Sequence, residues 1–151
     1  MSRFAARMEA LSVLYEADER DESIEDALRE RLQIQEEGVV TDLRVLPEYA
    51  KEIAEGVASH KEEIDRIIRA NSTWKLERMG VVDRNILRMG VWECLYGQPG
   101  STGAYINESV KLAKIYCDSK SVNFIYGVLC AASGRNRGDK GEGPKSIELK
   151  V

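Results

Sequence analysis

The stretch Met79–Tyr96 reads Met-Gly-Val-Val-Asp-Arg-Asn-Ile-Leu-Arg-Met-Gly-Val-Trp-Glu-Cys-Leu-Tyr. Its apolar residues recur at the spacing of a helical face, and they include Ile86, Leu87, Val91, Cys94 and Leu95. This set is wider than a single stripe, so more than one neighbouring element has to cover it. Gly90 lowers helix stability relative to alanine, and close approach of another helix would explain its presence. The stretch is therefore predicted to be a central helix around which the other elements pack.

The charged residues of this stretch are predicted to be structural. Arg84 and Arg88 are four residues apart and are expected to share one exposed edge. Asp83 falls in the first turn, where the helix dipole stabilises a carboxylate. Asp65, Glu77, Asp83 and Glu93 are separate carboxylates, so each is interpreted as a dipole or ion-pair group and not as half of an acid/base pair.

Helical periodicity predicts about six further helices and no strand, so the fold class is all-α. Ser2 is expected to cap a helix that runs to about residue 17, and Ser23 to cap one that reaches about residue 34. Further helices are expected over about 49–59, around 64–71 and over 106–116, with Ile115 or Tyr116 on the apolar face of the last of these. Residues 97–103 form a predicted turn. Ser119 or Ser121 is expected to cap a last helix that ends near residue 132.

The first predicted helix carries two basic residues on one side. Its apolar face is expected to hold Phe4, Met8, Leu11, and Leu14 or Tyr15, while Arg3 and Arg7 project together from the other side. The simpler interpretation of this arginine pair is a solvated helix face. The alternative is a short phosphate-binding edge, because each guanidinium offers a fork of donors to phosphate oxygens.

Composition limits the class of protein. A chain of 151 residues is by default one domain, and its net charge of −4 argues against a generally basic nucleic-acid binder. Three cysteines without metal-ligand spacing and a single histidine predict no metal site, reduced thiols and a cytoplasmic location. No apolar run approaches membrane-spanning length. Residues 1–133 are the predicted folded domain, and residues 134–151, rich in glycine, lysine and arginine, are a predicted disordered tail.

Familiar catalytic and cofactor motifs are missing from the sequence. There is no P-loop, no GxGxxG after a strand, no HExxH and no nucleophile elbow. This pattern favours a binding protein over an enzyme, and no cofactor is expected.

Four blocks of sequence, in order and in register, resemble the NusB family. They are Trp74-Lys-Leu-Glu-Arg-Met79, Val82-Asp-Arg-Asn-Ile-Leu-Arg88, Ile106-Asn-Glu-Ser-Val-Lys-Leu-Ala-Lys114 and Phe124-Ile-Tyr-Gly-Val-Leu129. The pattern Arg-x-x-Ala-Leu-x-x-Leu-Tyr at Arg7–Tyr15 fits as well, so the resemblance extends from about Arg3 to Ala132. It implies two small helical bundles and no catalytic activity. It also implies binding of boxA RNA in ribosomal RNA leader transcripts together with NusE, a ribosomal protein, within the RNA polymerase antitermination complex.

The resemblance also implies site residues. RNA-binding positions are Arg3, Arg7, Lys120, Ser121, Asn123 and Phe124, with Arg135 and Arg137 of the tail as further cations. An exposed Phe124 would stack on an unpaired base, whereas a core Phe124 is the structural alternative. Tyr15 and Asp83 match the surface that faces NusE, and for Tyr15 the alternative is a mostly buried ring.

The sequence is compatible with two other hypotheses. The chain is alternatively a dimeric helical protein-interaction module with weak or lost RNA binding, as its acidic balance and its short arginine cluster would allow. An enzyme is the third hypothesis, and it would require a site that the sequence does not show.

Overall fold

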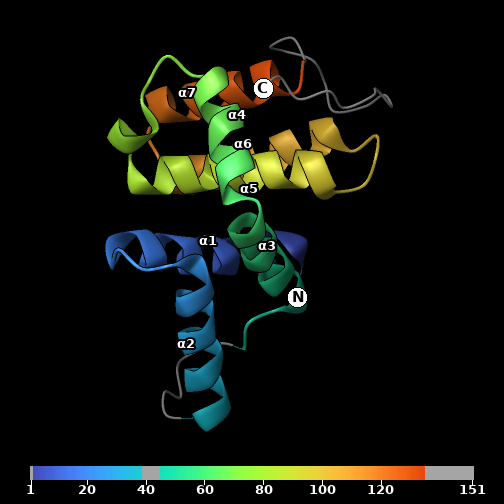
Figure 1. The fold of residues 1–151 in the computed structure, drawn as a ribbon. Coiled ribbons are helices and arrows are strands. Elements are labelled where there is room, and N and C mark those ends of the chain that lie inside the picture. Colours follow the sequence, from blue (N-terminus) through green and yellow to red (C-terminus); the bar gives the residue numbers. More distant parts are fainter. Residues whose placement is uncertain (1, 39–44, 135–151) are drawn as a thin grey trace. The chain divides into compact units, whose positions relative to one another are not determined.

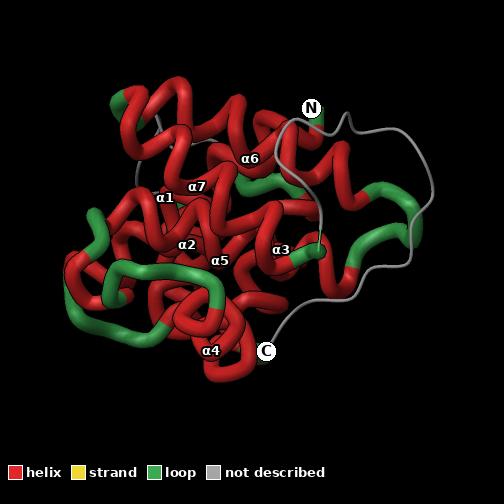
Figure 2. The backbone as a smooth tube through the Cα atoms, turned by 90° about the horizontal axis from the view of Figure 1, so that it is seen from above, coloured by secondary structure: helices red, strands yellow, loops and turns green. Residues whose placement is uncertain are grey.

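Helices make up all the regular structure of the computed structural model, which describes residues 2–38 and 45–134. Seven α-helices and one 3₁₀ turn occur in these residues, and Figure 2 draws no strand among them. The all-α prediction of about seven helices is therefore confirmed. The elements are α1 (Arg3–Glu19), α2 (Ile24–Glu37), α3 (Glu48–Ser59), α4 (Lys61–Ala70), η1 (Leu76–Arg78), α5 (Val81–Tyr96), α6 (Thr102–Tyr116) and α7 (Ser119–Ala132).

The chain divides into two compact units, Met1–Ser59 and His60–Val151. The first contains α1, α2 and α3, coloured from blue to teal in Figure 1, and the second contains α4 to α7. Two helical bundles are what the family resemblance implied. The tail was predicted over residues 134–151, of which residues 135–151 lie outside the described residues. None of the described helices is long and apolar enough to cross a membrane.

The first unit is built on α1, which packs against both α2 and α3. Two predicted caps are confirmed: the Ser2 hydroxyl accepts the N–H of Ala5 at 3.1 Å, and the Ser23 hydroxyl accepts the N–H of Asp26 at 3.0 Å. Each cap satisfies one of the backbone donors that a helix leaves unpaired at its start. Gly38 ends α2 in the left-handed conformation, with φ of 65°.

The predicted buried face of α1 is only partly correct. Phe4 and Met8 are half-buried, Tyr15 is exposed, and Arg7 is buried with 5% of its surface accessible. Arg7 is spaced at helical intervals from two buried residues, Ala10 and Leu14, so it continues a buried row. The prediction that Arg3 and Arg7 project together into solvent is wrong for Arg7. Helical periodicity had assigned the charged residues of this helix to its exposed face.

The second unit is built on α5, which packs against α4, α6 and α7, as predicted for the central helix. Ile86, Leu87 and Val91 are almost fully buried. Gly90 is also buried, and a Cβ atom there would lie 2.8 Å from Ser109 Oγ of α6 and 3.0 Å from Leu129 Cδ2 of α7. The expected close approach of another helix at Gly90 is confirmed, because two helices meet the backbone of α5 at that point.

Two boundaries of the second unit differ from the sequence prediction. The helix α6 begins at Thr102, inside the predicted turn over 97–103. Asp118 caps α7 in place of Ser119 or Ser121, and its carboxylate accepts the N–H of Ser121 at 2.8 Å. This hydrogen bond lowers the pKa of Asp118. A carboxylate next to the first serine competes for the cap because it is an equally good acceptor.

Two apolar side chains near the end of α6 are exposed. Ile115 and Tyr116 retain about half of their accessible surface, 53% and 47% respectively, although one of them was predicted to lie on the buried face. The buried face of α6 instead contains Tyr105, Ile106, Ser109, Leu112 and Ala113.

Arg88 of the second unit belongs to a buried charge pair. The prediction that Arg84 and Arg88 share one exposed edge is therefore wrong for Arg88. Arg88 is 5% exposed, and its guanidinium donates to both carboxylate oxygens of Asp65, at 2.8 and 3.2 Å. It also donates to Asn85 Oδ1 at 3.1 Å. The interpretation of Asp65 as an ion-pair group is correct, and this pair links α4 to α5.

Candidate functional site

Two arginines and one tyrosine form a stacked group in the first unit. Tyr49 of α3 contacts both side chains: the guanidinium carbon of Arg3 is 4.2 Å from the centre of its ring, and that of Arg7 is 5.7 Å away. Such cation–π contacts hold a guanidinium in place without neutralising its charge. Arg3 is exposed and Arg7 is buried, so Arg3 is the member of the pair that can contact a phosphate directly.

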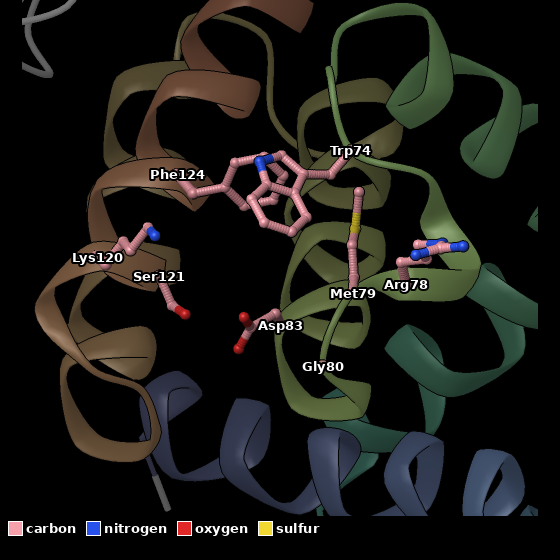
Figure 3. A pocket seen from close by; sticks show the side chains of 8 residues that line it. All are labelled: Trp74, Arg78, Met79, Gly80, Asp83, Lys120, Ser121 and Phe124. Atoms are coloured by element: carbon pink, nitrogen blue, oxygen red, sulfur yellow. The ribbon is translucent and has the colours of Figure 1, made fainter.

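A second candidate site is a pocket of the second unit, here called the Trp74–Phe124 pocket (Figure 3). Its volume is about 190 Å³. The two rings lie 6.4 Å apart, centre to centre, in an edge-to-face arrangement with an interplanar angle of 70°. The pocket is lined by Trp74, Arg78, Met79, Gly80, Asp83, Lys120, Ser121 and Phe124.

The pocket brings together most of the second-unit residues to which the family resemblance assigns a binding role. Lys120, Ser121 and Phe124 come from the first turns of α7, and the carboxylate of Asp83 points into the space that they face in Figure 3. Phe124 is half-buried, intermediate between the two alternatives for this ring. Asn123 is exposed and does not line the pocket. Asp83 thus lies beside residues implied for RNA binding, although the resemblance assigns it to the partner surface.

Tyr15, the other residue implied for partner binding, lies in the first unit and is 42% exposed. It borders a groove between α1 and α2, and Ile34, which is 36% exposed, lines the same groove. The alternative prediction, that the ring of Tyr15 is mostly buried, is wrong. Around the groove, Arg20 forms ion pairs with Glu16 and Glu30, and Arg31 forms one with Glu9.

The thiol of Cys117 contacts Asp83, the same carboxylate that lines the pocket. It donates to Asp83 Oδ1 at 3.0 Å. Burial, followed by the hydrogen bond and negative charge of Asp83, raises the pKa of Cys117 to about 12. Both causes disfavour a thiolate, so this cysteine is a poor nucleophile and metal ligand at neutral pH.

Cys117 is expected to resist alkylation by iodoacetamide in the native protein. With a pKa of about 12, only about one thiol in 10⁴ is ionised at pH 8, so the rate should rise about tenfold per pH unit. Replacing Asp83 with asparagine should speed alkylation, because it removes the negative charge but leaves the burial. Peptide mapping by mass spectrometry separates Cys117 from Cys94 and Cys130. Labelling of native Cys117 as fast as that of free cysteine would contradict this assignment.

Sequence reasoning did not single out Tyr49 or Trp74 as a functional residue, and Trp74 entered only as the first residue of one of the four blocks that resemble the NusB family. The structure places Leu76 in the core but leaves Trp74 53% exposed. Neither role has a local signal, because the partners of Tyr49 and Trp74 are about 40 to 50 residues away along the chain.

These features define an all-helical protein of two bundles whose surface sites combine aromatic rings with basic side chains. The family model described as "NusB family" matches residues 5–133. The chain therefore belongs to the NusB family.

Known relatives agree with this assignment. The transcription antitermination protein NusB of Bifidobacterium longum subsp. infantis is 47% identical over 132 residues, covering 87% of this chain and 68% of the relative. A structure of T. maritima NusB superposes with a TM-score of 0.68 at 28% identity, covering 85% and 88% of the two chains. A structure of antitermination factors NusB and NusE in complex with dsRNA also gives 0.68, at 34% identity, covering 87% and 96%.

Proposed function

We propose that this protein is a transcription antitermination factor that binds boxA-type RNA of ribosomal RNA leader transcripts together with NusE. The observation that carries the proposal is membership in the NusB family, one of whose solved structures contains NusE and RNA. The protein would act in the cytoplasm within an RNA polymerase complex, by binding and without catalysis. Residues in both units provide the basic, aromatic and polar side chains that RNA binding requires.

The binding residues divide into two roles. Basic side chains position the phosphates, and aromatic and polar groups contact the bases. Arg3, held on Tyr49, and the exposed Lys120 serve the first role. Phe124, Ser121 and Asn123 serve the second, and the buried Arg7 supports Arg3 through the shared ring. An aromatic ring at the edge of a pocket favours unpaired bases, because bases inside a duplex are already stacked.

Replacing Phe124 with alanine is expected to weaken binding of single-stranded RNA by about 1–3 kcal/mol, or roughly 5- to 150-fold, through loss of stacking. Replacing Arg3 with alanine should weaken binding regardless of sequence and lower the salt dependence by about 0.7 in log–log slope. Fluorescence anisotropy titrations at several salt concentrations measure both effects.

A matched control is Arg29→Ala, which removes an exposed arginine of the first unit that pairs with Asp26. RNA affinity should not change in this variant. If Phe124→Ala and Arg3→Ala both bind RNA as tightly as this control, the RNA-binding assignments are wrong.

The partner surface is proposed at Tyr15, because its exposed ring and Ile34 offer apolar area on a groove with a charged rim. Tyr15→Asp should weaken binding of NusE, measured by calorimetry, while leaving the affinity of the protein alone for RNA unchanged. For Asp83 the family resemblance implies the same role, and the experiment of the next subsection separates that role from RNA binding.

A second candidate function is a dimeric interaction module with weak or lost RNA binding. The observation that favours it is the exposure of Ile115 and Tyr116 on neighbouring positions of α6. This function is tested by comparing the sedimentation of the unmodified protein with that of an Ile115→Lys variant. A stable dimer that the substitution dissociates, combined with only salt-driven, sequence-independent RNA binding, would favour the module.

A further inference from the structure

The Trp74–Phe124 pocket combines three kinds of group. Aromatic rings form one part of its wall, the exposed side chain of Lys120 lies at its rim, and a single carboxylate, Asp83, points into it (Figure 3). Arg78 also lines the pocket, but its guanidinium is directed away from the other labelled side chains. Rings accept a flat π-system, and basic side chains attract phosphates. The carboxylate only accepts hydrogen bonds, so it requires a ligand with donors. A nucleotide with donors on its base satisfies all three.

The size of the pocket limits what enters it. A volume of about 190 Å³ is below the roughly 300–1,000 Å³ of pockets that enclose whole drug-sized ligands. The ligand part that enters is therefore one base, while its sugar and phosphates stay at the rim. Ordinary single-stranded RNA offers such bases, because they can turn outward without breaking a pair.

Asp83 retains hydrogen-bonding capacity for such a base. An ionised carboxylate has about four acceptor positions, and the thiol of Cys117 occupies one of them on Oδ1. Asp83 is half-buried in the first turn of α5, so hydrogen bonds to its charge are stronger than those at a fully exposed group.

We propose that the Trp74–Phe124 pocket holds one unpaired base of the bound RNA and that Asp83 selects guanine at this position. This inference rests on the proposed RNA-binding function. Guanine carries two adjacent donors, N1–H and the N2 amino group, on its Watson–Crick edge, and they match the two oxygens of a carboxylate. Adenine and cytosine place an acceptor beside their amino group, and uracil flanks its N3–H with two carbonyl oxygens.

The test compares three ten-nucleotide RNAs: oligouridylate, the same RNA with one central guanosine, and the same RNA with inosine in place of guanosine. Inosine lacks the N2 amino group and keeps N1–H. The unmodified protein should bind the guanosine RNA about tenfold more tightly than oligouridylate, as one bidentate contact allows, with inosine in between. Fluorescence anisotropy measures the three dissociation constants.

Asp83→Asn should remove this preference, because an amide offers one acceptor and one donor to a base edge with two donors. The matched control is Glu77→Gln, which neutralises an exposed carboxylate of η1 outside the pocket lining and should keep the preference. Trp74→Leu should weaken binding of all three RNAs through loss of an aromatic wall. Circular dichroism confirms that each variant is folded.

The outcomes separate this inference from the proposed function. No binding of any RNA by the unmodified protein, with or without NusE, would overturn both. Equal binding of all three RNAs would overturn only the guanine pocket, as would a guanine preference that survives in Asp83→Asn. If Asp83→Asn keeps the RNA preference and weakens only NusE binding, the pocket receives a basic side chain of the protein partner, and the inference is wrong.

Discussion

Replacing Asp65 with alanine is expected to lower the free energy of unfolding of the second unit by about 3–5 kcal/mol. The substitution leaves the guanidinium of Arg88 buried without the carboxylate to which it makes two hydrogen bonds, at 2.8 and 3.2 Å. An unpaired charge in the interior loses its hydration with no compensation. Urea denaturation followed by tryptophan fluorescence measures this change, because both tryptophans, Trp74 and Trp92, belong to the second unit.

The double variant Asp65→Leu/Arg88→Met is the informative control. It removes both charges and fills the site with apolar groups, and such replacements are often neutral or stabilising. The double variant should therefore be more stable than Asp65→Ala alone. Arg69→Ala, which breaks the exposed pair between Arg69 and Glu77, should leave the denaturation midpoint unchanged. A midpoint for Asp65→Ala equal to that of Arg69→Ala would mean that the buried pair does not stabilise the fold.

Replacing Gly90 with valine is expected to destabilise the second unit by about 3 kcal/mol, at the upper end of the usual cost of overpacking. Even the Cβ atom would lie 2.8 Å from Ser109 Oγ and 3.0 Å from Leu129 Cδ2, so the two γ-methyl groups of valine would force α6 or α7 to shift. Gly90→Ala should cost less, because alanine recovers about 1 kcal/mol of helix propensity. The same urea denaturation measures both variants.

The matched control adds Ser109→Ala to Gly90→Ala. Removing the hydroxyl group gives the new methyl group the space that Ser109 Oγ occupied, so the double variant should be more stable than Gly90→Ala alone. Additive effects of the two substitutions would mean that they do not interact, contrary to the close contact seen at this position.

Most of the fold could be predicted from the sequence because it depends on local patterns. Helical spacing located all seven α-helices, and serine at positions 2 and 23 marked the starts of two of them. The prediction was wrong at the start of α7, where Asp118 and two serines are all acceptable caps and only the backbone conformation selects one.

The candidate site was less accessible to sequence reasoning. The family resemblance pointed to Lys120, Ser121 and Phe124, and the structure joins them with Asp83 and Trp74 from other parts of the chain. The role of Tyr49 under Arg3 and Arg7 could not be predicted, since a contact between α1 and α3 follows from packing and leaves no periodic signal.

By itself, the sequence determined the class of fold, the position of the central helix and the family. Each of these follows from spacing or motifs along the chain. The tertiary structure alone decided which charged residues are buried. Arg7 and Arg88 look like exposed residues in a periodic pattern, yet both are buried, Arg7 beside the half-buried ring of Tyr49 and Arg88 against the buried carboxylate of Asp65. The physical reason is that helix formation depends on neighbours within a few residues, whereas burial of a charge depends on a partner that the fold brings from far away.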